Sequence, residues 1–371
     1  MIIGVPKETK SREKRVALTP QVVKELIGKG FSVLVQKGAG EGSFFDDDLY
    51  SSVGAKITDY QTVFQTADIV LALNTPSDEA ISMMKLKAVL ICFLYPSSLA
   101  CSLKLIEQTG ISVFAMNAVP RISRAQKMDA LSSQSNLAGY KTVLLAANAF
   151  GKIFPMMMTA AGTIKPAKVV IMGAGVAGLQ ALATAKRLGA IVEVSDIRPE
   201  TKEQVQSLGG VFIELKGDNT MITEGGYVKD ISEDFLLKQQ ALIAEHIAEA
   251  DIVITTALIP GKKAPVLITE KMVKSMRAGS VIVDMATEQG GNCELSELDQ
   301  TTLKFGVTII GESNVPSLLA ADASQLYAKN ISALLLHLAD NETFFWDFED
   351  VITTDSLLVH EGKVPEYTKI N

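Results

Sequence analysis

The most constraining feature of the sequence is a glycine triad between a short apolar run and a helical pattern. The apolar run Lys168–Met172 is predicted to be a strand, and the pattern G-x-G-x-x-G over residues 173–178 follows it directly. A helix is predicted over residues 179–188, and a second strand, Ile191–Ser195, ends at Asp196. This order of strand, glycine turn, helix, strand and acid is typical of a βαβ unit in a doubly wound parallel sheet.

The same residues predict a dinucleotide site, with a structural glycine turn as the alternative. Gly173 permits the tight turn, Gly175 lets the backbone approach a pyrophosphate at the helix N-terminus, and Gly178 lets helix and strand pack closely. A carboxylate at Asp196 would accept hydrogen bonds from the adenosine ribose and repel a 2′-phosphate, which favours NAD(H) over NADP(H). The cofactor-binding residues predicted here are Gly173, Gly175, Val176, Ala177, Gly178, Asp196, Ile197 and Arg198.

Composition limits the class of protein. A chain of 371 residues that is 47% hydrophobic and 21% charged is typical of a soluble α/β enzyme of about two domains. The formal net charge of −7 argues against a nucleic-acid partner, because nucleic-acid-binding surfaces are basic. The three cysteines and three histidines show no metal-ligand spacing, so no metal site is predicted, and the cysteine usage fits a reduced, cytosolic-type compartment.

Apolar runs of strand length alternate with helical patterns along the chain. They predict an α/β protein with two Rossmann-like domains, each with a parallel doubly wound sheet, and a cleft between them. We predict a discontinuous N-terminal domain of residues 1–135 and 325–371, and an NAD(H)-binding domain of residues 136–324. Among the predicted strands are Ile2–Val5, Ile252–Thr255, Val281–Asp284 and Val307–Ile310.

Two helices connect the predicted domains. One is expected at residues 136–150, and another, at 324–338, returns the chain to the first domain. The stretch 142–162 is the most membrane-like part of the sequence, but Lys152 and Pro155 interrupt it and it is short for a span. We therefore interpret that stretch as a buried interdomain helix.

The densest polar segment lies near the predicted domain junction, at residues 120–136. Such a cluster could hold a nicotinamide carboxamide and its ribose by hydrogen bonds. The alternative is a solvated loop and helix start, with Ser132 or Ser133 as the N-cap. Its polar side chains include Arg121, Arg124, Gln126, Asp129, Ser132, Ser133 and Gln134.

Three further segments are candidates for cofactor contacts. Residues 255–261 and 311–316 each follow a predicted strand at the carboxyl edge where a dinucleotide passes, although either could be an ordinary turn. Residues 217–229 could close over the nucleotide as a lid or form a plain exposed loop. The cofactor-binding residues predicted from these segments are Tyr227, Thr256, Ala257 and Leu258.

An acid–base catalyst is missing from the expected places. A dehydrogenase acting on an alcohol or amino acid moves a proton with the hydride, usually through a His, Lys or carboxylate. No histidine occurs before His246. Arg12, Lys14 and Arg15 could bind a substrate carboxylate, or could be solvated surface charge. Direct transfer between two nicotinamides needs no acid or base, only two rings held close and correctly oriented.

Taken together, the motifs resemble the NAD(H)-binding components of the proton-translocating NAD(P) transhydrogenases, meaning the alpha subunit or its first part. The resemblance covers essentially the whole chain. Its most specific segments are 121–129 (RISRAQKMD), 131–140 (LSSQSNLAGY), 154–162 (FPMMMTAAG) and 255–262 (TTALIPGK).

The resemblance implies roles for several residues and for partners. Arg121, Gln126 and Asp129 would hold the nicotinamide end, Ser132 would assist, and Tyr227 would belong to a mobile loop over the NAD(H) site. NADH would pass its hydride to NADP(H) bound on a partner component, and a membrane-spanning component would couple the transfer to proton translocation. The chain would be a homodimer, active only with its partner. It would lie in the cytoplasm or an organelle matrix, peripheral to the inner membrane.

Alanine dehydrogenases are similar in fold and share the segments 4–8 (GVPKE) and 15–20 (RVALTP). That family uses a Lys and a His of its first domain, but the corresponding strand ends here read 73–76 (LNTP) and 94–96 (LYP). An alanine dehydrogenase-type enzyme is therefore the alternative, and it would need another proton donor such as Lys7 or Tyr95. A third hypothesis is an NAD-sensing module that binds the nucleotide without transferring hydride.

Overall fold

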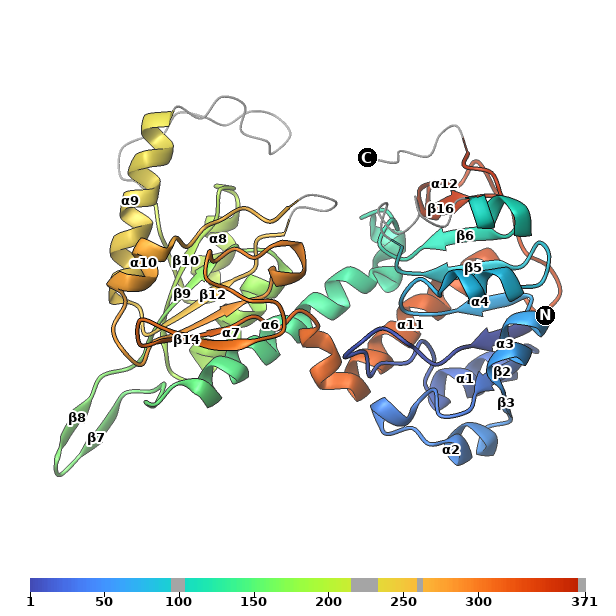
Figure 1. Ribbon diagram of the computed structural model, residues 1–371, viewed down its shortest axis with the longest axis horizontal. Helices are drawn as coiled ribbons and strands as arrows, with labels where there is room; N and C mark the ends of the chain where they lie inside the picture. Colours follow the sequence, from blue (N-terminus) through green and yellow to red (C-terminus); the bar gives the residue numbers. More distant parts are fainter. Residues whose placement is uncertain (95–103, 215–232, 259–262, 366–371) are drawn as a thin grey trace. The chain divides into compact units, whose positions relative to one another are not determined.

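The computed structural model describes residues 1–94, 104–214, 233–258 and 263–365 (Figure 1). The chain divides into two compact units, one of Met1–Gln134 with Pro316–Asn371 and one of Ser135–Val315. Each unit contains a mostly parallel sheet flanked by helices, which confirms the predicted α/β class with two Rossmann-like sheets. The assignment of domains, with boundaries at 135 and 325, stays a proposal.

In the first unit the described strands form a seven-stranded sheet of order β16-β6-β5-β4-β1-β2-β3. Neighbouring strands run parallel except β16, which pairs antiparallel with β6. The strands are β1 (Ile2–Val5), β2 (Ser32–Gln36), β3 (Lys56–Thr58), β4 (Ile69–Leu71), β5 (Val89–Cys92), β6 (Ser112–Ala115) and β16 (Leu357–Val359).

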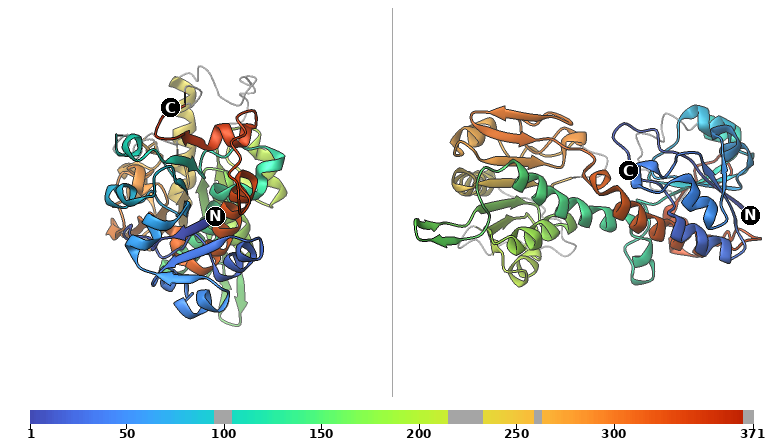
Figure 2. Two further views of the ribbon diagram at one scale, coloured as in Figure 1. Left: turned by 90° about the vertical axis from the view of Figure 1, so that its right-hand side faces the viewer. Right: turned by 90° about the horizontal axis from the view of Figure 1, so that it is seen from below.

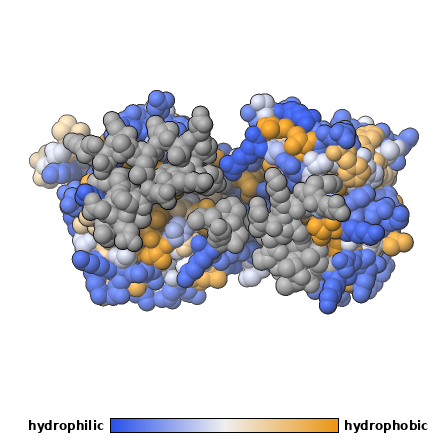
Figure 3. Space-filling model, turned by 90° about the horizontal axis from the view of Figure 1, so that it is seen from above, coloured by the Kyte–Doolittle hydropathy of each residue, from blue (hydrophilic) through white to orange (hydrophobic). Residues whose placement is uncertain are grey.

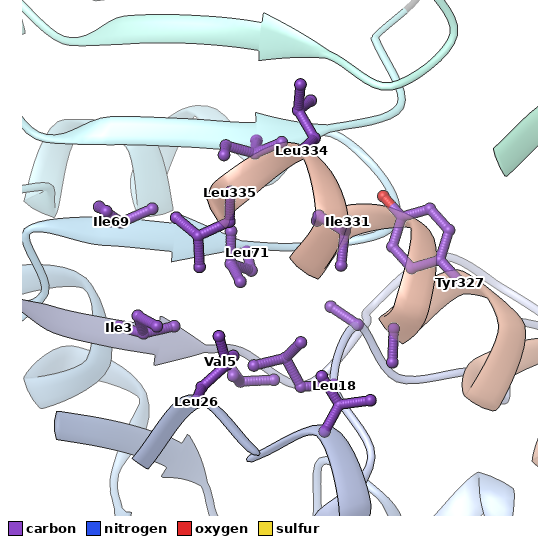
Figure 4. Packing of buried hydrophobic residues seen from close by; sticks show 14 of the residues in the cluster. Ile3, Val5, Leu18, Leu26, Ile69, Leu71, Tyr327, Ile331, Leu334 and Leu335 are labelled. Carbon is purple, nitrogen blue, oxygen red and sulfur yellow. The ribbon is translucent and has the colours of Figure 1, made fainter. Parts of the chain in front are cut away.

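The long helix α11 (Ala320–Leu338) joins this unit from the far end of the chain. Its buried side chains, among them Tyr327, Ile331 and Leu335, lie against those of β1 and β4, including Ile3 and Leu71 (Figure 4). Burial of such apolar surface is the main force that holds the two segments together. The unit's other helices include α1 (Pro20–Gly28), α2 (Asp47–Ser52), α3 (Tyr60–Thr66), α4 (Asp78–Met83) and α12 (Val351–Ser356), with 3-10 turns η1 (Glu41–Ser43) and η2 (Ser123–Met128); the turn η4 (Val315–Leu319) leads into α11.

In the second unit the described strands form a seven-stranded sheet of order β11-β10-β9-β12-β13-β15-β14, parallel except for the edge strand β14. From β9 the chain first adds β10 and β11 on one side of that strand. It then crosses back and adds β12 on the other side of β9, which is the arrangement of a doubly wound fold. The strands are β9 (Lys168–Met172), β10 (Ile191–Ser195), β11 (Val211–Phe212), β12 (Ile252–Thr255), β13 (Val281–Asp284), β14 (Thr301–Lys304) and β15 (Val307–Ile310). The helices are α6 (Ala130–Ala149), α7 (Val176–Arg187), α8 (Thr201–Ser207), α9 (Glu233–Glu249) and α10 (Glu270–Ser275), with the turn η3 (Thr287–Gln289).

Helix α6 starts earlier than predicted. It begins at Ala130, in the first unit, rather than at residue 136. The carboxylate of Asp129 accepts the Ser132 N–H at 2.8 Å and therefore acts as the cap. The alternative in which Ser132 or Ser133 is the N-cap is wrong, because both lie inside the helix.

The stretch 142–162 is not one buried helix, so that prediction is wrong. Helix α6 ends at Ala149, and an antiparallel hairpin of β7 (Met157–Thr159) and β8 (Gly162–Ile164) follows. Residues 155–165 are all exposed, and the hairpin projects from its unit in Figure 1 and in the right-hand view of Figure 2. Pro155, with Gly151 before it and Gly162 after it, favours the end of the helix over its continuation.

The face of the molecule seen in Figure 3 is predominantly polar where it is coloured. Charged and polar residues cover most of the coloured surface in Figure 3, and apolar residues form small separate groups. Within the described ranges, no helix combines the length and the apolarity needed to cross a membrane.

Candidate functional site

The nucleotide part of the candidate site lies at one edge of the second sheet. Main-chain pairing aligns Ser195 of β10 and Thr255 of β12 with Met172 of β9. The glycine turn, Asp196 and Thr256 therefore follow at the same level, at the carboxyl ends of three neighbouring parallel strands. In doubly wound sheets, ligands bind at this edge where the strand order reverses.

The three glycines of the triad have different surroundings. A Cβ atom at Gly178 would lie 1.8 Å from the Gly173 carbonyl oxygen, and one at Gly173 would lie 2.5 Å from Thr256 Oγ1. Gly173 also has a φ of +108°, which favours glycine. A Cβ at Gly175 would meet no atom within 4 Å, so open space lies beside this residue. Tight packing on two sides and open space at the N-cap of α7 fit a pyrophosphate bound to the helix N-terminus.

The carboxylate of Asp196 already accepts hydrogen bonds from neighbouring groups of its own chain. It accepts the Ala174 N–H at 2.6 Å and three donors of Arg198, namely the main-chain N–H at 2.9 Å, Nε at 3.0 Å and Nη2 at 2.9 Å. Burial alone would raise the pKa of Asp196, but the hydrogen bonds from Arg198 and Ala174 outweigh it and hold the pKa below its ordinary value. A carboxylate has about four acceptor positions. The predicted bonds to a ribose therefore require the Arg198 side chain to give up at least one of its own.

A side chain that the motifs did not indicate fixes the turn after β12. Asn292 is fully buried, and its Nδ2 donates to the carbonyls of Ala257 at 2.9 Å and Pro265 at 2.8 Å. Its Oδ1 accepts the Ala257 N–H at 3.1 Å. The N–H groups of Asn292 and Cys293 both donate to Asp284, which is fully buried at the end of β13. Both main-chain polar groups of Ala257 are thus engaged by the protein itself.

The other predicted nucleotide contacts differ in exposure. Val176, Ile197 and Leu258 are exposed apolar side chains, as expected of groups that a ligand could cover. Ala177 is half-buried, and its carbonyl oxygen would lie 2.1 Å from a Cβ atom at Gly139 of α6. Helix α6 therefore packs directly on the first turn of α7. The sequence offered one signal for this contact, because glycine inside a predicted helix is unfavourable without a packing reason.

The proposed nicotinamide residues lie in the first unit, on η2, on the residues that flank it and on the start of α6. Asp129 and Ser132 are in direct contact, since the Asp129 carboxylate accepts the Ser132 hydroxyl at 2.6 Å as well as its N–H. The side chains of Arg121 and Gln126 are exposed. The structure thus pairs two of the four predicted residues and leaves the other two directed to the surface.

The basic cluster near the N-terminus divides into two kinds of residue. Arg12 and Lys14 are exposed, whereas Arg15 is buried. The guanidinium of Arg15 donates from Nε and Nη2 to the two oxygens of Glu13, at 2.8 and 2.6 Å, and from Nη1 to Gln134 Oε1 at 2.8 Å. Its charge is thus neutralised by a carboxylate of the same chain.

Two acids that share the donor Asn74 differ in the pKa of their carboxyl groups. Asn74, just after β4, donates through Nδ2 to Glu8 at 2.9 Å and to Glu13 at 3.2 Å. Burial raises the pKa of Glu8 to about 7, against the opposing hydrogen bonds from Asn74 and Leu73. Burial also acts to raise the pKa of Glu13, but its hydrogen bonds and ion pair with Arg15 lower it to about 2. Nothing in the sequence distinguishes these two glutamates, so this cluster was not predicted.

The structure does not test every prediction made from the sequence. Tyr227 and Tyr95 lie outside the described residues. The predicted cleft between the two domains stays a prediction. Among the described residues, no group of three or more His, Cys, Asp or Glu side chains is placed to hold a metal ion.

Comparison with known proteins assigns both halves of the chain. Residues 4–138 match the family model "Alanine dehydrogenase/PNT, N-terminal domain", and residues 142–367 match "Alanine dehydrogenase/PNT, C-terminal domain". The chain is 48% identical to the first part of the NAD(P) transhydrogenase alpha subunit of Rhodospirillum rubrum, over 98% of this chain and 97% of that protein. It is 34% identical to alanine dehydrogenase of Bacillus subtilis, over 85% of this chain and 80% of that protein.

A solved structure gives the same assignment. The transhydrogenase from Sinorhizobium meliloti is 45% identical, matches 98% of this chain and 100% of that chain, and superposes with a TM-score of 0.89. Two matching family models, a relative of almost equal length and a near-complete structural match all agree. The chain therefore belongs to the alanine dehydrogenase/PNT family and, within it, to the NAD(P) transhydrogenase alpha subunits.

Proposed function

We propose that this chain binds NAD(H) at the glycine turn of the second unit and passes hydride directly to NADP+ bound on a partner component. A separate membrane-spanning component would couple the transfer to proton translocation, and the chain would act as a homodimer. The glycine triad is the one dinucleotide fingerprint that we identify in the sequence. The second nucleotide is therefore assigned to another chain.

Bound NADH would supply a hydride from C4 of its nicotinamide ring. The residues of this chain would bind and orient it. The turn at Gly173 and Gly175, with the N-terminus of α7, would bind the pyrophosphate. Asp196 would accept from the adenosine ribose once Arg198 yields a bond. Arg121, Gln126, Asp129 and Ser132 would hold the nicotinamide end, where orientation rather than proton transfer limits the reaction.

The observation that favours direct transfer is that the polar side chains around Asn74, just after β4, are already bonded to one another. Asn74 donates to both Glu8 and Glu13, and Arg15 is paired with Glu13 and donates to Gln134. A 2-oxo acid would find no uncompensated guanidinium at Arg15. Lys7, a suggested proton donor, is exposed and pairs with Glu41 at 3.3 Å. These contacts argue against the alanine dehydrogenase alternative.

Hydride transfer should depend on the partner. The test is to bind NADH to the purified chain, follow its fluorescence, and then add the NADP(H)-binding transhydrogenase component. We expect NADH binding by the chain alone, and transfer to a nicotinamide analogue only with the partner present.

Other outcomes would select the other hypotheses. Rapid NADH-to-NADP+ transfer by the chain alone would refute the proposal. Oxidation of NADH that depends on ammonia and pyruvate would support the alanine dehydrogenase type. Tight NADH binding without transfer, even with the partner bound, would support an NAD-sensing module.

A further inference from the structure

The turn η2, which carries Gln126, is attached to the C-terminal part of the first unit by an ion pair. Arg124 Nη2 donates to Asp350 Oδ1, and the side chain of Asp350 is only 7% exposed. The second oxygen of Asp350 lies 2.6 Å from His337 Nε2 and accepts the Thr353 N–H at 3.3 Å. Burial alone would raise the pKa of Asp350, but His337 and Arg124 outweigh it and hold the pKa low, so Arg124 faces a carboxylate.

A second contact holds the main chain of the same turn. Asn330, on α11, donates through Nδ2 to the Lys127 carbonyl at 2.8 Å. Its side chain is buried, and its Oδ1 accepts no hydrogen bond from the part of the chain that the structure describes. A buried acceptor without a partner is unfavourable. The bond to Lys127 is therefore the favourable contribution that accounts for a polar residue at this place.

We propose that Asp350 and Asn330 are positioning residues for hydride transfer, because they fix the turn Ser123–Met128 and thereby the side chain of Gln126. The proposal rests on the proposed function for its effect on transfer. The attachment points, Arg124 and Lys127, lie on either side of Gln126 in the sequence. Neither Asp350 nor Asn330 is assigned a contact with nucleotide, so both act through the turn.

The physical reason is the geometric demand of direct transfer. A displacement of about 1 Å between reacting groups can slow a reaction about 100-fold. Asp129 is already held by Ser132. Gln126 is exposed on a short 3-10 turn, so its position depends on how firmly the main chain on both sides is held. Loss of either attachment should broaden the positions of Gln126 without touching the glycine turn.

The experiment compares Asp350→Asn, Asn330→Ala and Arg124→Gln with the matched control Asp68→Asn in the full-length chain. Asp68 also accepts a main-chain N–H in the first unit, from Ile2 at 2.8 Å, and also pairs with a cation, Lys85. Three quantities are measured: the rate of transfer from NADH with the NADP(H)-binding component, the NADH affinity of the chain alone, and hydrogen exchange of the amides at 123–129 without any partner.

We expect Asp350→Asn and Asn330→Ala to slow transfer about tenfold while NADH affinity changes less than about twofold. Exchange at 123–129 should become faster in both, and Asp68→Asn should change none of these quantities. Arg124→Gln combined with Asp350→Asn should be no slower than Asp350→Asn alone, because the two residues share one contact. Arg124→Lys should recover part of the rate lost in Arg124→Gln.

Two results would overturn the proposal. One is unchanged exchange at 123–129 in both Asp350→Asn and Asn330→Ala. The other is a loss of NADH affinity as large as the loss of rate. If the unsubstituted chain transfers no hydride with its partner, the proposed function fails, and the exchange data still decide whether the turn is anchored. If Asp350→Asn does not fold, Arg124→Gln tests the same bond, because the Arg124 side chain is 56% exposed.

Discussion

Glu8 should make the first unit less stable as the pH rises. Its buried carboxyl has a pKa of about 7 against an ordinary value of 4.5. The folded state therefore binds this proton more tightly than the unfolded state does. The stabilising contribution is complete below about pH 4.5 and is lost as the pH rises through about 7. Replacing Glu8 with Gln removes the titration while keeping the size of the side chain.

The expected change in the free energy of unfolding follows from the raised pKa of Glu8. A rise in pKa from 4.5 to about 7 corresponds to about 3 kcal/mol. Linkage over the accessible range, from about pH 5 to about pH 8.5, gives about 2.5 kcal/mol. The free energy of unfolding of Glu8→Gln minus that of the unsubstituted chain should therefore increase by roughly 2.5 kcal/mol across this range. Glu13 titrates near pH 2 and does not contribute in this window.

The chain offers a specific probe for the assay. Its one tryptophan, Trp346, packs against the core of the first unit, so its fluorescence reports unfolding of that unit in urea. The Trp346 ring contacts the His360 ring, with 4.4 Å between the ring centroids, so its fluorescence intensity also depends on this local contact. Midpoints and slopes of the urea curves are therefore compared, rather than intensities. Glu25→Gln, at an exposed position of α1, is the matched control.

A difference in unfolding free energy between Glu8→Gln and the unsubstituted chain that stays flat from about pH 5 to about pH 8.5 would refute the raised pKa of Glu8. The same slope in Glu25→Gln would also refute it, because the effect would then not come from burial. A difference that decreases with pH would mean that the hydrogen bonds from Leu73 and Asn74 outweigh desolvation.

Further predictions concern the candidate site. Gly175→Ala should fold normally, because a Cβ there meets open space, but should weaken NADH binding; normal binding in a fluorescence titration would remove the pyrophosphate from this turn. Gly178→Ala should both weaken NADH binding and lower the thermal midpoint of the second unit, since its Cβ would lie 1.8 Å from a carbonyl oxygen. Asp129→Asn or Arg121→Ala should slow transfer by about tenfold or more with a much smaller effect on NADH affinity, whereas equal losses would assign these residues to binding alone. Asp196→Ala should weaken NADH binding, and an unchanged affinity would exclude the residue from the ribose site.

Local sequence was sufficient for the buried parallel strands. The bounds of β10, β12, β13 and β15 were predicted as the structure has them. β12 and β13 are buried along their whole length, and such strands are short apolar runs that end at a polar or turn residue, so their limits can be read from the sequence.

The start of α6 could not be obtained in the same way. Residues 130–135 include three serines, which compete with helical hydrogen bonding, so the helix was predicted to begin only at residue 136. The cap at Asp129 and the bond from Arg15 to Gln134 decide the matter, and the second of these joins residues 119 positions apart.

The sequence by itself determined the two Rossmann-like sheets and the place of the glycine turn, because the triad and Asp196 follow strands whose limits are marked by local residue patterns. Only the tertiary structure decided how the candidate site is held. Ala174 donates to Asp196 from 22 residues away, Asn292 binds both polar groups of Ala257, and Asp350 holds Arg124 from 226 residues away. Hydrogen bonds between distant segments depend on which elements fold side by side, and no spacing in the sequence records them.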